Sequence, residues 1–146
     1  MTTDAREMLA SAGLRITAPR VTVIDALADH PHAAADAVFA KVSETLPRTS
    51  LQAVYNVLGD LTARGLARRI EPAGSPALYE LRVGDNHHHL VCHVCGTVVD
   101  VDCVTGHAPC LTPSDDHGFA IAEAEVTFWG VCTACREAAV DTAPAQ

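Results

Sequence analysis

Aromatic side chains and long apolar runs are scarce in this chain of 146 residues, although 49% of it is hydrophobic. Aromatics make up only 4%, so a core has to come mainly from Ala, Val and Leu. Residues 1–30 hold no apolar run typical of a signal peptide, and no stretch is long enough to span a membrane. We therefore expect a cytoplasmic protein whose six cysteines are thiols or metal ligands.

The motifs of zinc enzymes are also missing. Neither His-x-Glu nor His-Glu-x-x-His occurs, although a catalytic zinc needs an open coordination position and a nearby general base. The sequence therefore argues against a zinc hydrolase or deaminase, and we expect no enzyme. A metal-storage or carrier protein is a further alternative, but it would have no use for the arginines and the exposed helix described below.

Positive charge is nearly absent from the second half. Residues 1–82 carry nine basic and nine acidic groups, whereas residues 83–146 carry one basic group and nine acidic ones, which accounts for the net charge of −8. Such an asymmetry predicts two parts with different tasks. We place a DNA-binding domain at 1–82, a hinge at 83–87, a metal-binding domain at 88–137 and a flexible tail at 138–146.

The first part reads as helices followed by a short hairpin. Helical segments are expected to end at Gly13, near His30-Pro31, at Pro47 and at Gly65, and two strands follow over 66–70 and 77–81. Thr17 is the expected cap of the second helix, and Thr49 or Ser50 caps the fourth. Helices followed by a two-stranded wing are typical of the winged helix-turn-helix.

The fourth helix is the candidate for DNA recognition. Its apolar side chains are expected on one face, at Leu51, Val54, Leu58 and Leu61. The other face is left with Gln52, Tyr55, Asn56 and Gly59. A polar and aromatic face of this kind suits the major groove. An ordinary packed helix in a small α-rich domain is the alternative interpretation.

Cysteine pairs mark the second part. Cys92 and Cys95 form one Cys-x-x-Cys pair, and Cys132 and Cys135 form another. Two pairs with matching spacing predict a closed tetrahedral zinc site. Two disulfides or a thioredoxin-like redox pair fit less well, because the spacings match and no β-α context surrounds either pair.

The histidines beside the first pair indicate a second metal. His87 and His89 alternate along an expected strand, so their imidazoles point to the same face. Four cysteines already saturate a zinc ion, so these imidazoles predict a site with its own ligands. Cys103 and Cys110 are left over, and they are either a reversible disulfide pair or two inert thiols.

Three motifs together resemble the ferric uptake regulator family of metal-dependent repressors. They are residues 13–20 (Gly-Leu-Arg-Ile-Thr-Ala-Pro-Arg), 52–55 (Gln-Ala-Val-Tyr) and the His- and Cys-rich stretch 87–96 followed by Asp100. The resemblance covers residues 8–136 and keeps the family's motif order. Within the family it is closest to the actinobacterial redox-responsive branch, whose members typically control catalase-peroxidase genes and their own.

The resemblance implies an α+β homodimer. It has an N-terminal winged helix-turn-helix domain and a small α/β dimerisation domain with a structural Zn²⁺ on four cysteines. It also implies a regulatory Fe²⁺ or Mn²⁺ site, whose ligands here are His32, Glu80, His87, His89 and Asp100. His32 on its own could equally be an exposed loop histidine. DNA contacts fall to Arg15, Arg20, Gln52, Tyr55 and Asn56, the last at a position where relatives often carry arginine.

A third, accessory metal site of some relatives is in doubt here. His107 lies near one of its ligand positions, but Ala124 occupies another and cannot bind a metal. The function expected from these features is metal-dependent repression at a pseudo-palindromic double-stranded operator, with peroxide as the signal. An iron-responsive ferric uptake repressor is the alternative, since the pair Glu80 and Asp100 does not distinguish the two.

Overall fold

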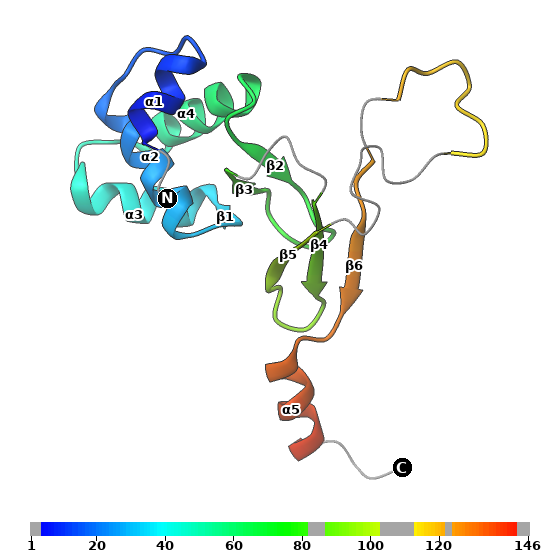
Figure 1. The fold of residues 1–146 in the computed structure, drawn as a ribbon. Coiled ribbons are helices and arrows are strands. Elements are labelled where there is room, and N and C mark those ends of the chain that lie inside the picture. The colour runs from blue at the N-terminus through cyan, green and yellow to red at the C-terminus, as the bar shows by residue number, and fades with distance from the viewer. Residues whose placement is uncertain (1–3, 82–86, 103–112, 122–123, 143–146) are drawn as a thin grey trace. The chain divides into compact units, whose positions relative to one another are not determined.

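The computed structural model describes residues 4–81, 87–102, 113–121 and 124–142, drawn as coloured ribbon in Figure 1. The chain forms two compact units, Met1–Val83 and Gly84–Gln146. The predicted hinge lies almost wholly outside the described residues, except that His87 already belongs to a strand.

Helices dominate the first unit. They are α1 (Ala5–Ser11), α2 (Ala18–Asp29), α3 (Ala35–Thr45) and α4 (Leu51–Ala63). The side chain of Thr17 accepts a hydrogen bond from the backbone N–H of Arg20, and that of Ser50 accepts one from Ala53. Both predicted caps are thereby confirmed, with Ser50 the cap of α4, because each satisfies an N–H that the first helical turn leaves unpaired.

A three-stranded antiparallel sheet completes this unit, in the order β1 (Ala33–Ala34), β3 (Leu78–Glu80), β2 (Arg68–Ile70). The two strands of the wing were predicted, with slightly longer bounds. The short strand β1 was not predicted, because alanine has no strand preference of its own. Its pairing with Tyr79 and Leu78 comes from tertiary structure.

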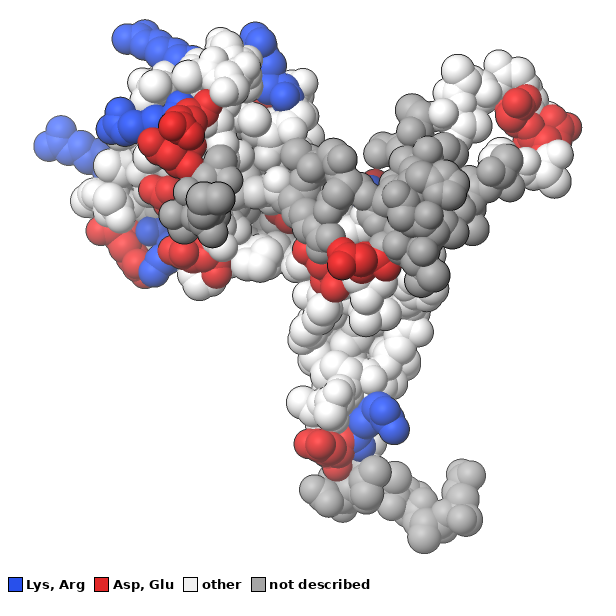
Figure 2. Space-filling view, viewed as in Figure 1, with Lys and Arg blue, Asp and Glu red and all other residues white. Residues whose placement is uncertain are grey.

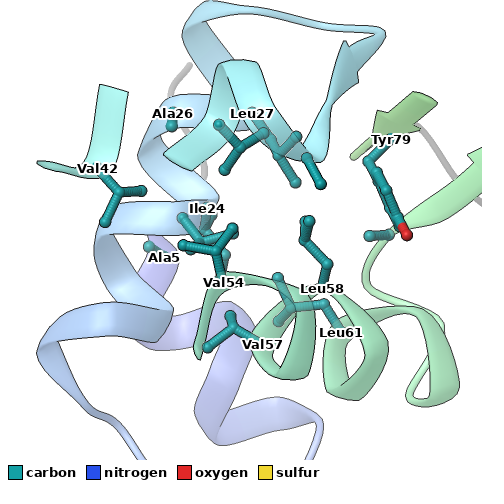
Figure 3. Close-up of a cluster of buried hydrophobic side chains, with 14 of the residues drawn as sticks. Ala5, Ile24, Ala26, Leu27, Val42, Val54, Val57, Leu58, Leu61 and Tyr79 are labelled. Carbon is teal, nitrogen blue, oxygen red and sulfur yellow. The ribbon is translucent and has the colours of Figure 1, made fainter. Parts of the chain in front are cut away.

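Buried aliphatic side chains from all four helices form the core of the first unit (Figure 3). Leu9, Val23, Leu27, Val42, Val54, Leu58 and Leu61 are at most 1% exposed. The prediction that Leu51 faces this core was wrong, since it is 36% exposed and Val57 is buried instead. Leu51 occupies the first position of α4, at the edge of the apolar stripe that Val54, Leu58 and Leu61 continue.

The second unit is built around one small sheet. Its order is β5 (Val98–Asp102), β4 (His87–Cys92), β6 (Thr127–Gly130), with β5 antiparallel and β6 parallel to β4. The four residues of β6 pair with His89–Cys92.

The last element that the structure describes is α5 (Thr133–Thr142). A flexible tail was predicted from residue 138, yet the helix continues through Ala138 and Ala139. Alanine is the strongest helix former, which explains the extension beyond the cysteine pair. No helix in the described ranges is long and apolar enough to cross a membrane.

Candidate metal centres and recognition helix

Two tight backbone segments carry the four cysteines of the second unit. Cys92 ends β4, and Cys95 lies in the turn that leads to β5. The N–H of Gly96 donates to the carbonyl of Cys92 over 2.8 Å, and Gly96 has φ of +79°, which glycine adopts without strain. Cys132 and Cys135 lie at the start of α5. Each Cys-x-x-Cys pair is therefore presented from a local turn of the backbone.

The four sulfurs converge on one point. All lie within 4.8 Å of one another, and none is in a disulfide. The sulfurs of Cys95 and Cys132 are 3.7 Å apart. Zn–S bonds of about 2.3 Å put two sulfurs of a tetrahedron about 3.8 Å apart, so the separation suits a tetrahedral thiolate site. The disulfide and redox-pair interpretations are inconsistent with this single cluster.

Hydrogen bonds prepare some of these sulfurs for a cation. The backbone N–H of Cys132 donates to the sulfur of Cys92 over 3.3 Å, and this bond contributes most to lowering the pKa of Cys92 to about 6. The Thr97 hydroxyl lies 3.0 Å from the sulfur of Cys95 and lowers its pKa. By contrast, interactions with the sulfurs of Cys132 and Cys95 raise the pKa of Cys135 to about 12. Without a metal, four negative charges cannot gather here, so Cys135 keeps its proton.

Imidazoles and a carboxylate meet on one face of the same sheet. His87 and His89 lie on β4, and Asp100 on β5 is the cross-strand partner of His89. One carboxylate oxygen of Asp100 lies 3.3 Å from Nε2 of His89 and 3.6 Å from Nε2 of His87. The two rings are 5.0 Å apart between centroids and nearly perpendicular. The alternation read from the sequence therefore brings both imidazoles to one carboxylate.

A second set of candidate ligands belongs to the first unit. Nε2 of His32 lies 2.9 Å from a carboxylate oxygen of Glu80, which is 1% exposed. His32 has φ of +63°, a left-handed conformation that few residues other than glycine adopt. It precedes β1, which pairs with β3, the strand that carries Glu80. The strained backbone and the sheet together hold the imidazole at the carboxylate.

The remaining histidines have different surroundings. His88 faces the opposite side of β4, is only 6% exposed and packs edge-on against Phe128 at a ring distance of 6.4 Å. His93 is exposed, and the side chain of His117 is 79% exposed. The candidate thiols Cys103 and Cys110 lie outside the described residues, as does His107.

Helix α4 presents a polar and aromatic face. Tyr55 is 45% exposed, and the side-chain amide of Gln52 donates to the amide oxygen of Asn56 over 3.0 Å. Figure 2 shows Lys and Arg side chains over the helical unit, to which nine of the ten basic residues belong. The unit combines an exposed helix face with nearly all of the basic residues, although nine acidic residues balance their charge.

Arg20 makes contacts that sequence reasoning missed. Its guanidinium binds the carboxylate of Asp60 at 3.0 Å and donates to the backbone carbonyl of Arg15 over 2.8 Å. These bonds tie the start of α2 to the exposed side of α4. The separation of 40 residues between Arg20 and Asp60 leaves no local signal in the sequence.

Most of this chain is similar in sequence to known proteins. Residues 11–129 match the model of the ferric uptake regulator family. The transcriptional regulator FurA of Mycobacterium tuberculosis is 56% identical over 132 residues, covering 90% of each chain. Ferric uptake regulation protein 1 of Mycolicibacterium fortuitum is 55% identical over 134 residues, covering 92% of this chain and 83% of that protein.

The fold also matches a solved structure. The ferric uptake regulator of Vibrio cholerae superimposes with a TM-score of 0.65 at 25% identity, covering 88% of this chain and all of that one. Family members are transcriptional regulators, not enzymes, and the Vibrio cholerae protein has DNA-binding domains. A winged-helix unit, a four-cysteine cluster and these relatives agree that the chain belongs to the ferric uptake regulator family of metal-responsive transcriptional regulators.

Proposed function

We propose that this regulator is a cytoplasmic, metal-dependent repressor that senses peroxide through Fe²⁺ or Mn²⁺ and controls catalase-peroxidase-type genes. The observation that carries the proposal is the ligand chemistry of the second metal set. His87 and His89 converge on Asp100 without any thiolate. Imidazole and carboxylate ligands suit Fe²⁺ and Mn²⁺, whereas thiolates favour Zn²⁺.

The four-cysteine cluster has a separate role in this proposal. Its sulfurs fit Zn²⁺ and leave no open coordination position for a reactant. Zinc there stabilises the fold of the second unit and takes no part in sensing. A repressor that also needs a reactive ion must therefore hold that ion elsewhere, on nitrogen and oxygen ligands.

The regulatory ion is proposed to bind all five candidate ligands. The first unit supplies only His32 and Glu80, and the second supplies only His87, His89 and Asp100. Either set alone is small for an ion that prefers octahedral coordination. One ion bound by both sets would fix how the two units are oriented, and this couples metal binding to DNA affinity.

Dimer symmetry turns this orientation into operator recognition. In a two-fold homodimer, the positions of the two α4 helices set the spacing of the half-sites that they reach. In this proposal Arg15 and Arg20 lie at phosphates, and Gln52, Tyr55 and Asn56 read base edges. The ring of Tyr55 can make apolar contacts with the methyl groups of thymine in the major groove.

Peroxide would act on the ligands of the bound ion. Fe²⁺ held by these ligands would activate peroxide at the site. Overall, peroxide would oxidise the imidazole of His32 or His87 by two electrons, with one peroxide oxygen entering the ring and the other leaving as water. The oxidised ring binds metal less well, the two units lose their fixed orientation, and the DNA is released. The loss is irreversible because no simple reductant restores the imidazole.

The decisive experiment measures DNA binding across one cycle of oxidation. Protein loaded with Fe²⁺ binds a fluorescent duplex carrying the sequence that the protein itself selects from a random library, and anisotropy is recorded before and after a stoichiometric peroxide pulse. Fresh Fe²⁺ is then added without oxygen, and a thiol reductant is added in a separate second step. Binding should be lost and should not return, with a gain of about 16 Da on the peptide of His32 or His87.

Controls separate the alternatives. Mn²⁺-loaded protein should keep its DNA through the pulse, because Mn²⁺ does not reduce peroxide as Fe²⁺ does. His117→Ala, which changes an exposed histidine, should behave as wild type. Full recovery with fresh Fe²⁺ would instead support the iron-responsive repressor, and recovery that requires the thiol reductant would assign the response to Cys103 and Cys110. Metal-loaded protein that selects no duplex contradicts the repressor function itself.

A further inference from the structure

Gly59 lies in the interior of α4, at a position where the backbone conformation does not require glycine. It lies inside the helix Leu51–Ala63, and its φ is not in the left-handed region where glycine is favoured. Apart from its chain neighbours and the backbone of the helix itself, no heavy atom of the described residues lies within 4 Å of the position that a Cβ would take. Because glycine inside a helix is less stable than alanine, Gly59 lowers the stability of α4 without a compensating contact within the chain.

The position of Gly59 on the helix indicates what it serves. With 3.6 residues per turn, Gly59 lies one turn beyond Tyr55 and two turns beyond Gln52. All three are exposed, whereas Val54, Leu58 and Leu61 are buried on the opposite side. Gly59 is therefore near the middle of the exposed face of α4.

The side chains around Gly59 are held along the helix and leave this position open. Gln52 donates to Asn56, one turn along the same row. Asp60, the next member of that row, is bound by Arg20 at 3.0 Å. The exposed face therefore combines a fixed row of polar groups with a bare stretch of backbone beside Tyr55.

A side chain at position 59 would cover part of this face. Cβ atoms point toward the N-terminus of a helix, so a residue at 59 lies over the turn that holds Tyr55 and Asn56. Glycine keeps the phenol ring of Tyr55 accessible and allows the backbone itself to come close to a partner. Close approach of backbone to a ligand is a common reason for glycine in an otherwise unsuitable position.

The geometry points to Gly59 as a specificity-determining position, the place where α4 comes closest to the floor of the DNA major groove. This inference rests on the proposed role of α4 in DNA recognition. A side chain at 59 would hold the helix away from the base edges, so that Tyr55, Gln52 and Asn56 lose contact with them. Arginines at the phosphates would be less affected, because longer side chains bridge a small displacement.

Substitutions of increasing size at position 59 test this. The probes are the duplex that Mn²⁺-loaded wild-type protein selects from a random library, and an unselected duplex of equal length. We expect Gly59→Ala to bind the selected duplex about tenfold more weakly and Gly59→Leu about a hundredfold more weakly, the scale of losing one or two base contacts. Binding to the unselected duplex and its salt dependence should stay as in wild type.

Two further measurements exclude a merely structural effect. Gly59→Ala should raise the melting temperature of the first unit by about 4 °C, so weaker binding would come from a more stable protein. Ala28→Leu is the matched control, since Ala28 is an exposed helical residue of α2, and adding a leucine there should leave selection unchanged.

Results that contradict this inference can be distinguished from a result that contradicts the proposed function. If both variants at 59 bind the selected duplex as wild type does, this inference is wrong and the repressor function stands. An equal loss for selected and unselected duplexes also overturns it, because specificity would then be unaffected. If the wild type selects no duplex with metal bound, the proposed function fails and the inference fails with it.

Discussion

The two units of this regulator are stabilised by different means. In the first unit, aliphatic side chains from α1, α2, α3 and α4 bury one another completely. In the described part of the second unit, Val91 and Cys92 are the buried hydrophobic residues, and all four residues of β6 are exposed. The first unit is therefore stabilised by side-chain packing. The described part of the second unit has little core of its own, and in the proposed function it depends on a bound metal and a dimer partner. Removing the metal should therefore destabilise the second unit and leave the stability of the first unit unchanged.

Removing zinc should produce the largest difference between the units. Structural Zn²⁺ in small domains supplies apparent binding energies of about 10–16 kcal/mol, more than the whole stability of most domains. A strong chelator or Cys132→Ala should unfold the second unit and leave the first folded. The only tryptophan, Trp129, reports on the second unit, and the two tyrosines, Tyr55 and Tyr79, report on the first. Tryptophan fluorescence should therefore lose its melting transition while tyrosine fluorescence keeps it.

His117→Ala is the control for this comparison, because the side chain of His117 is 79% exposed and lies 3.6 Å from the carboxylate of the neighbouring Asp115. Simultaneous loss of both transitions on chelation would contradict the separation of the units. It would mean that the first unit needs the second in order to fold.

Truncating the core should reverse the pattern. Leu58→Ala removes a side chain that is fully buried in the core of the first unit. Such changes lower the free energy of unfolding by about 2–5 kcal/mol. Leu51→Ala is the matched control on the same helix, since Leu51 is 36% exposed and should lose less than about 1 kcal/mol. Urea unfolding followed by tyrosine fluorescence measures both. Equal losses for the two variants would show that Leu51 packs as deeply as Leu58.

Sequence reasoning predicted features that depend on neighbouring residues better than features that depend on the assembled core, such as the different burial of Leu51 and Leu58. The caps Thr17 and Ser50 depend on chemistry within a few residues, and each was predicted correctly. The matching spacing of the two cysteine pairs likewise indicated that the four sulfurs cluster. Helical periodicity gave the apolar side of α4 but misjudged its edge. A position at the start of a helix has neighbours that only the assembled core defines.

Contacts between residues far apart in the chain could not be predicted from the sequence. The strand β1 exists because Ala33 and Ala34 pair with β3, and Arg20 binds Asp60 across 40 residues. For the candidate ligands, strand alternation explained why His87 and His89 share a face. Glu80 and His32 were assigned only by family resemblance, and their 2.9 Å separation depends on the register of a three-stranded sheet. No pattern along the chain encodes that register by itself.

Proton release should mark zinc binding in the second unit. At pH 7 the thiol of Cys92, with a pKa of about 6, is mostly ionised, whereas Cys135, with a pKa raised to about 12, is protonated. Zinc binds thiolates, so loading at pH 7 must release at least the proton of Cys135. Below pH 6 Cys92 also holds a proton in the metal-free protein, so more protons are released and zinc affinity falls.

Calorimetric titration of zinc in two buffers of different ionisation enthalpy gives the number of protons released at each pH. The number should rise as the pH falls from 7 to 5. A number that stays constant over this range would contradict the lowered pKa of Cys92. Zinc binding without any proton release at pH 7 would contradict the protonated state of Cys135.

The smallest effect is expected in the first unit, at the ion pair between Arg20 and Asp60. The Asp60 side chain is 50% exposed, and pairs in such positions contribute less than about 1 kcal/mol because water and salt screen them. Asp60→Asn should therefore lower the stability of the first unit only slightly, and less at high salt. Glu44→Gln, at the more exposed pair with Lys41, is the matched control and should change even less. Arg20 would remain fixed by its bond to the carbonyl of Arg15, so a large loss in Asp60→Asn would reveal that this ion pair, and not the buried leucines, holds α2 against α4.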